Sequence, residues 1–176
     1  FYTTPFSLFA SILHGATPPR VGLWISAFML PFALLSFPFG MLADRYSKTA
    51  LMCGGSIVYG VFTASLGFWP TDFITLGMAA TGVSAAVMFV PSMLMTTDLA
   101  PAAIRSTALG AFNTAGSLGF ILGPLCGGLI SEAVRAEHGP AAGYQAAFAA
   151  AGASVILCAL VGLPFLLRLR RAGRTT

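Results

Sequence analysis

The stretch FPFGMLADRYSK, from Phe37 to Lys48, ends a long apolar run with a small cluster of charge. Asp44, Arg45 and Lys48 follow one another closely, although only 8% of the 176 residues are charged. Soluble domains carry about 25% charged residues, so a soluble fold of this size would lack polar side chains for its surface. The composition therefore predicts a protein whose surface lies mostly in lipid.

Charged residues divide the chain into uncharged runs, and a helix needs about 20 residues to cross a bilayer. Six such runs are predicted as spans, at residues 1–13, 21–43, 49–71, 73–97, 106–131 and 143–167. The first would reach only about 20 Å as a helix, so we expect the chain to begin inside a truncated helix. The prediction is an all-α membrane protein, with residues 1–176 forming a single bundle of six transmembrane helices.

The basic residues predict the orientation of the bundle. Alternate loops hold Arg45 with Lys48, then Arg105, and finally the arginine-rich tail that begins at Arg168. The opposite loops hold only Arg20 and Arg135. Cytoplasmic loops carry the excess of Lys and Arg, so the C-terminal tail is expected in the cytoplasm. We expect a bacterial inner membrane.

The string GMLADRYSK, residues 40–48, resembles the loop signature G-x-L-a-D-R-x-G-R-[KR] of the major facilitator superfamily. The resemblance implies a conformational latch between the second and third helices, formed by Gly40, Asp44, Arg45 and Lys48. Asp44 would face the positive N-terminal end of a neighbouring helix. The plainer interpretation is a stop-transfer cluster. The chain departs from the signature at Ser47, at Lys48 and at the next residue, Thr49.

A second string, GFILGPLCGG, covers residues 119–128. Gly119, Gly123 and Gly127 recur every four residues, which puts them on one helix face and permits close contact with another helix. Pro124 removes a backbone donor and can bend the helix. With Gly128, the string is similar to the antiporter motif G-x-x-x-G-P-x-x-G-G in the fifth helix of the same family.

The family resemblance implies a fold of twelve helices in two halves, with substrate bound between the halves. Six spans would then be one half, and the other half of the same polypeptide would be a partner. First halves often carry R-x-x-Q-G in the fourth helix, but the corresponding residues 78–82 contain no arginine. No Asp, Glu, Arg, Lys or His lies in the middle of a span, although membrane proton relays need such a group. We favour the C-terminal half, and the alternative is an N-terminal half.

Candidate residues for the substrate cavity are uncharged. Four are polar side chains within spans, namely Tyr2, Ser7, Asn113 and Ser117. Ser84 and Met88 are added because, in the family, the first and fourth helices of each half line the cavity. Asn113 is the best single candidate, because a buried amide needs partners. A serine could instead bond only to its own helix.

The resemblance implies a secondary active transporter that exports small molecules, drug-like compounds or metabolites, by alternating access. The alternatives are an intramembrane enzyme and a bundle that transports nothing. An enzyme of the Ser–His type needs its histidine at membrane depth, whereas His14 and His138 lie at span ends. We expect no catalytic residue, metal or cofactor. The partners would be the bilayer and a small-molecule substrate, without nucleic acid, and the coupling ion, a proton or another, stays open.

Overall fold

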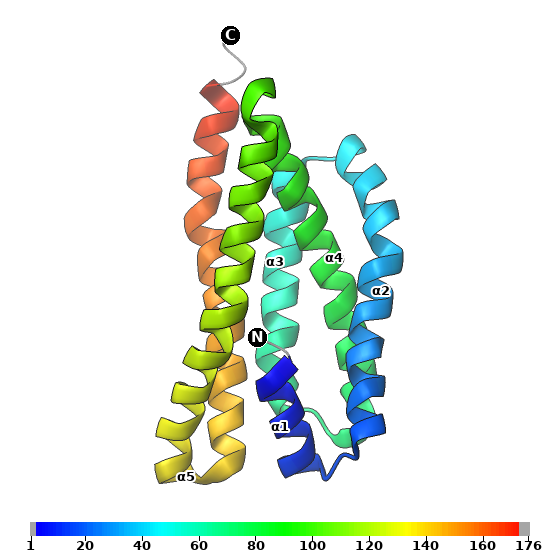
Figure 1. Ribbon diagram of the computed structural model, residues 1–176, viewed down its shortest axis with the longest axis vertical. Helices are drawn as coiled ribbons and strands as arrows, with labels where there is room; N and C mark the ends of the chain where they lie inside the picture. The colour runs from blue at the N-terminus through cyan, green and yellow to red at the C-terminus, as the bar shows by residue number, and fades with distance from the viewer. Residues whose placement is uncertain (1–2, 173–176) are drawn as a thin grey trace.

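The computed structural model describes residues 3–172 and folds them into helices joined by short turns (Figure 1). The long helices are α1 (Thr3–His14), α2 (Pro18–Arg45), α3 (Lys48–Ser65), α4 (Ile74–Leu99) and α5 (Arg105–Ala172). Three single 3-10 turns connect them, namely η1 (Leu66–Phe68), η2 (Thr71–Phe73) and η3 (Ala102–Ile104). The prediction of an all-α fold is confirmed over this range. Tyr2, one of the cavity candidates, lies outside the described residues.

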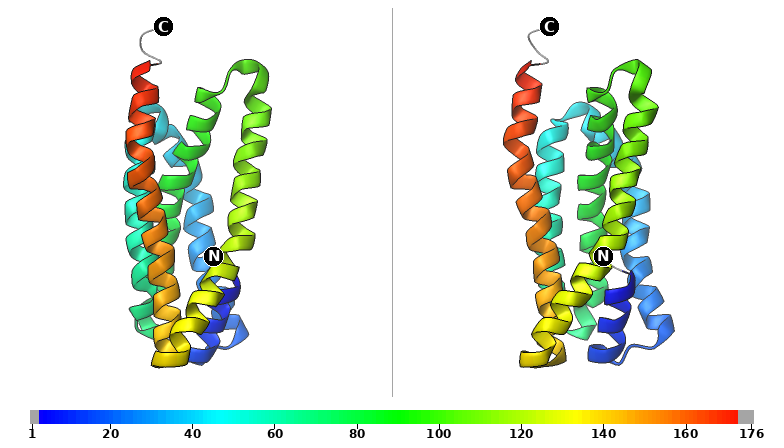
Figure 2. Two further views of the ribbon diagram at one scale, coloured as in Figure 1. Left: turned by 90° about the vertical axis from the view of Figure 1, so that its left-hand side faces the viewer. Right: turned by 60° about the vertical axis from the view of Figure 1, so that its left-hand side comes forward.

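The last helix, α5, turns back on itself at Gly139. This residue has φ 86° and ψ 171°, a backbone conformation that glycine adopts because it has no Cβ. Two arms result, residues 105–138 and 140–172, which run in opposite directions and meet at the turn (Figure 2). The arms are in close contact there, since a Cβ on Gly143 would come within 2.5 Å of the Ser131 carbonyl oxygen. The predicted spans 106–131 and 143–167 therefore lie on separate arms.

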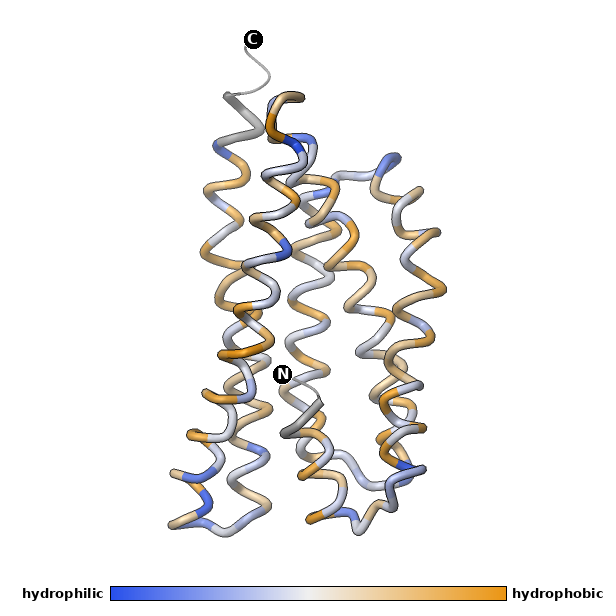
Figure 3. The backbone as a smooth tube through the Cα atoms, viewed as in Figure 1, coloured by the Kyte–Doolittle hydropathy of each residue, from blue (hydrophilic) through white to orange (hydrophobic). Residues whose placement is uncertain are grey.

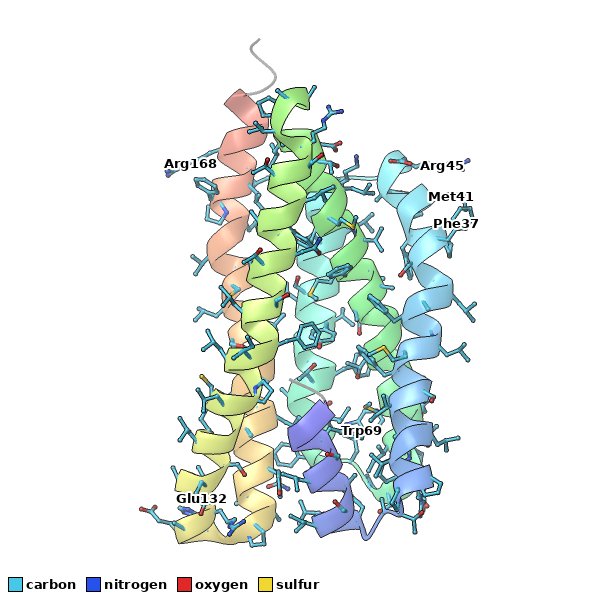
Figure 4. All side chains as sticks on the ribbon, in the orientation of Figure 1. Phe37, Met41, Arg45, Trp69, Glu132 and Arg168 are labelled. Carbon is cyan, nitrogen blue, oxygen red and sulfur yellow. The ribbon has the colours of Figure 1, made fainter. Side chains whose placement is uncertain are left out.

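Within the described residues, four stretches are long and apolar enough to cross a membrane: Pro18–Arg45, Lys48–Phe68, Thr71–Leu99 and the folded-back Ala102–Arg168. Apolar residues follow the helices, and polar residues gather toward their ends (Figure 3). Phe37 and Met41 on α2 point away from the bundle and are 74% and 52% exposed (Figure 4). Large apolar surfaces of this kind are rare on soluble monomers. The chain is an integral membrane protein.

The helix ends follow from local chemistry. α2 begins with Pro18 and Pro19, which fit the first turn because the N–H groups there have no helical acceptor. α3 begins after Ser47, whose Oγ accepts a hydrogen bond from the Ala50 N–H at 3.4 Å. The predicted run 49–71 is helical only to Phe68, and Trp69 is extended, as expected of a residue that precedes proline.

The buried core lies toward the end of the bundle that contains Trp69. Phe9 on α1 packs edge-on against Phe148 at 5.0 Å and against Tyr144 at 5.9 Å, measured between ring centroids. Aromatic pairs prefer such tilted arrangements. The other large members of the cluster are Phe6, Trp24, Phe28, Leu66, Ile74 and Met78. The short helix α1 is thereby held between α2 and the second arm of α5.

Within the described residues, the two tightest helix crossings leave no room for a side chain. A Cβ on Gly82 of α4 would overlap the backbone carbonyl oxygen of Phe28 on α2. Likewise, a Cβ on Gly152 in the second arm of α5 would overlap the carbonyl oxygen of Gly60 on α3. Small residues let backbones approach closely in membrane bundles, and these glycines do so here.

Candidate functional site

The charged loop between α2 and α3 lies at the opposite end of the bundle from the aromatic core. Figure 4 places Arg45 and Arg168 at this end, and Trp69 and Glu132 at the other. Lys48 is the first residue of α3, close to the last turn of α2. Arg45, Lys48 and Arg168, three of the basic residues that predicted the orientation, thus lie at the same end of the bundle.

Lys48 joins the ends of three helices. Its Nζ lies 2.6 Å from Oδ2 of Asp98 on α4 and 3.9 Å from Oδ1 of Asp44 on α2. The Lys48 side chain is 23% exposed, whereas the Asp44 and Asp98 side chains are 71% and 55% exposed. The shorter contact is the stronger one, and partial solvent screening limits it to about 0.2–1 kcal/mol. Asp98 is therefore the main partner of Lys48.

Sequence reasoning missed Asp98, which is far from the loop signature along the chain. A physical signal was available, because Asp98 occupies the last turn of α4. The C-terminal end of a helix carries partial negative charge, so a carboxylate there is unfavourable without a cation. An acid in that position at the end of an apolar run predicts a basic partner from another element.

The remaining residues of the proposed latch are less constrained within this chain. Gly40 faces Val90 on α4, and a Cβ on Gly40 would lie 3.8 Å from Val90 Cγ1, an ordinary contact. Arg45 is exposed. That Asp44 faces a helix N-terminus stays a prediction, and the partner found for its carboxylate is Lys48 on the next turn. Thr49, which departs from the family signature, is buried and donates to Met95 Sδ at 3.8 Å.

The glycine string lies on the first arm of α5, which bends near its middle (Figure 2). Gly119 and Gly128 are exposed, and a Cβ on either would meet no atom within 4 Å. Gly123 and Gly127 are buried. Gly123 lines a cavity of about 370 Å³ beside Ala150 and Ser154 of the second arm, and Pro124 and Gly127 line another beside Tyr144 and Leu8. Gly119 also borders the first cavity and Gly128 the second, so the whole string faces its own second arm and α1, although only Gly123 and Gly127 are buried.

The cavity candidates do not share one pocket in this chain. Ser84 lines a groove between α3 and α4, whereas Met88 lines a separate hollow of about 380 Å³ with Phe112 and Cys158 of α5. Ser7 on α1 is half-buried. Asn113 and Ser117 are exposed and lie four residues apart on the first arm, and hence on one face. The premise that the Asn113 amide is buried is wrong for this chain, and its cavity role stays a prediction.

Two buried hydroxyl groups of α4 are satisfied within their own helix. Ser84 Oγ donates to the Ala80 and Thr81 carbonyl oxygens at 2.8 and 3.0 Å, and Thr81 Oγ1 donates to Gly77 at 2.6 Å. Across the described part of the chain, every buried side-chain nitrogen or oxygen has a hydrogen-bond partner. Such back-bonding lets serine and threonine lie at membrane depth without a ligand.

Comparison with known proteins gives relatives, and the three described next are longer than this chain. An uncharacterised transporter of Methanocaldococcus jannaschii, described as MFS-type, is 30% identical over 134 residues, which are 75% of this chain and 34% of the relative. Protein spinster homolog 1 of Mus musculus is 29% identical over 140 residues, or 77% of this chain and 25% of that protein. Quinolone resistance protein NorA of Staphylococcus aureus is 31% identical over 121 residues, which are 67% of this chain and 31% of that protein.

The chain thus matches between a quarter and about a third of the length of these relatives. No solved structure matches it significantly. The family model for the Major Facilitator Superfamily matches residues 1–176. Both the loop signature and the glycine string lie inside that match, on the charged loop after α2 and on the first arm of α5. This chain belongs to the Major Facilitator Superfamily.

Proposed function

We propose that the chain is one six-span half of a secondary active transporter that exports small molecules by alternating access. The observation that carries the proposal is the contact of Lys48 with Asp98 and Asp44, which ties together the ends of α2, α3 and α4. A contact of this kind can form in one access state and part in the other, because hinge and shear motions rearrange helix ends as units.

In this proposal the six spans are α1, α2, α3, α4 and the two arms of α5. The exposed face of the first arm, with Asn113 and Ser117, would meet the other half of the transporter and line the substrate cavity. The absence of an arginine at residues 78–82 supports the C-terminal half. Substrates of such proteins bind near the midplane between the halves.

Two observations support export of drug-like compounds. One is the glycine string of residues 119–128, with Gly123 and Gly127 buried against neighbouring helical segments. The other is the similarity to a protein named for quinolone resistance. The coupling ion would be a proton or another ion. Its binding residues would belong to the other half, because no Asp, Glu, Arg, Lys or His lies in the middle of these spans.

The proposed orientation puts Arg45, Lys48 and Arg168 in the cytoplasm of a bacterial cell, with Trp69 and Glu132 on the outer side. The positive-inside rule supports this arrangement. Reporter fusions after Ser47 and after Gly139 are then expected to give opposite signals, because the two positions are at opposite ends of the bundle. Activity of alkaline phosphatase and fluorescence of a cytoplasmic reporter would measure this. Equal signals at the two positions would remove the six-span arrangement.

Transport is tested with the full-length parent in proteoliposomes, using a panel of fluorescent drug-like dyes and an imposed ion gradient. Asp98→Asn removes the charge 2.6 Å from Lys48 Nζ while keeping the side-chain size. A loss of up to about 1 kcal/mol would change the access-state populations and slow flux by up to about fivefold. Asp44→Asn should slow flux less, since its carboxylate lies 3.9 Å from Lys48.

The matched control is Glu137→Gln, which changes an exposed acid at the other end of the bundle and should transport at the parental rate. Parental flux in Asp98→Asn would show that the charged contact is not a latch. If the folded parent transports none of the dyes when the ion gradient is imposed, export of drug-like compounds is contradicted.

A further inference from the structure

His14, which the transport proposal does not use, joins three elements near the aromatic core. It is the last residue of α1, and its Nδ1 lies 2.7 Å from Thr71 Oγ1 in η2. Its ring meets Phe9 edge-on at 4.9 Å and Trp24 of α2 at 6.2 Å between centroids. The turn that follows is closed by a hydrogen bond from the Ala16 N–H to the Ala10 carbonyl oxygen, and Ala16 is only 8% exposed.

The charges around His14 come from separate elements. Arg20 of α2 lies over the Trp24 ring at 5.4 Å, so its positive charge is close to the histidine. From η2, the nearest ionisable residue along the chain is Asp72, which is exposed and next to Thr71. From the second arm of α5, Tyr144 contacts Phe9 through its ring. Burial, and then the positive charge of Arg20, lower the pKa of His14 below its usual value of 6.5.

We propose that His14 is a proton-controlled clasp, which holds the turn between α1 and α2 against η2 when neutral and releases it when protonated. The neutral ring packs among Phe9 and Trp24 at little electrostatic cost. A protonated ring would put a second positive charge beside Arg20 in a partly buried, aromatic environment. An imidazolium could still donate to Thr71 Oγ1, so the hydrogen bond does not decide the switch and the added charge does.

The direction of the pH dependence follows from linkage. Since the folded pKa of His14 lies below its unfolded value, the folded contact binds fewer protons than the released one. Stability from the contact is fully present above the unfolded pKa of about 6.5. This stabilisation is lost as the pH falls from the unfolded pKa of His14 to its lower folded pKa. Mild acid should therefore open this corner of the bundle, whereas neutral pH keeps it closed.

The experiment measures thiol accessibility in the full-length parent with its native cysteines replaced. Ala16→Cys puts a reporter thiol at a buried position in the clasped turn, and Thr17→Cys puts a matched thiol at the exposed neighbouring position. The ratio of their alkylation rates cancels the pH dependence of the reagent. This ratio should rise several-fold as the pH is lowered from about 7.5 to about 5, with a midpoint below about 6.5.

Three variants of the reporter proteins test the cause. His14→Gln keeps a polar partner for Thr71 but does not titrate, so its ratio should stay low at every pH. His14→Lys carries a permanent charge and should give a high ratio already at neutral pH. Arg20→Gln removes the repelling charge, so acid should raise the ratio less than in the parent. A parental ratio that does not change with pH, an unchanged pH response in His14→Gln, or a protected His14→Lys at neutral pH would each overturn the proposal.

Discussion

Gly82→Ala in the full-length parent is expected to destabilise the folded protein by about 2–3 kcal/mol, near the upper end for overpacking. The added Cβ would overlap the carbonyl oxygen of Phe28 and approach its Cα at 3.2 Å. These are backbone atoms, so no side-chain rotation can relieve the overlap and α2 must move away from α4. Size-exclusion chromatography of a fluorescent fusion after heating should show a melting temperature several degrees lower.

The matched control is Gly22→Ala on α2, the partner helix, where a Cβ would meet no atom within 4 Å. Alanine has a helix propensity about 1 kcal/mol more favourable than glycine, so this control should be neutral or slightly stabilising. Gly82→Ala has the same gain in helix propensity. Any net loss of stability relative to the control therefore measures the steric overlap between α4 and α2. A melting temperature for Gly82→Ala equal to that of the control would mean that α2 and α4 do not cross in close contact at Phe28.

Gly152→Ala is expected to destabilise the protein as much or more, because its Cβ would meet the backbone of α3 on two successive turns. It would overlap the Gly60 carbonyl oxygen and lie 2.7 Å from both N and Cβ of Ala64. Separation of α3 from the second arm of α5 would remove most of the contact between these helices. The expected result is a severalfold lower yield of monodisperse protein after detergent extraction, at equal total expression.

Gly162→Ala, on the same arm, is the control, since its Cβ would meet nothing within 4 Å. It should extract with the parental yield. Adding Ala64→Gly to Gly152→Ala should recover only part of the yield, because the overlap with the Gly60 carbonyl oxygen remains. Parental yield for Gly152→Ala alone would show that the two backbones lie further apart than the structure places them.

The charged loop between α2 and α3 could largely be predicted from the sequence, but the ion pair of Lys48 with Asp98 could not. Lys48 and Asp44 stand out in the sequence because charge is scarce, and their closeness follows from their spacing near the end of α2. Asp98 is 50 residues from Lys48 along the chain, and only the packing of α4 against α3 brings the two together. Ion pairs between distant elements depend on tertiary contacts that local spacing does not contain.

The glycines give the complementary case. A period of four residues predicted a close-packing face at Gly119, Gly123 and Gly127, yet a Cβ would find open space at Gly119. The tightest crossings occur at Gly82 and Gly152, which lie outside both the loop signature and the glycine string. A lone glycine in an apolar run has no local pattern that distinguishes a crossing point from an open surface.

The amino-acid sequence alone determined the solvent, the helical fold class and the family. In lipid each backbone N–H and C=O must find a partner within the protein, so long apolar runs have little alternative to the α-helix. Tertiary structure alone decided that Lys48 binds Asp98, that α2 and α4 cross at Gly82, and that His14 meets Thr71. Each of these depends on how a helix is rotated and where it crosses its neighbour. Those two quantities result from packing along the whole length of both helices, and no short stretch of sequence encodes them.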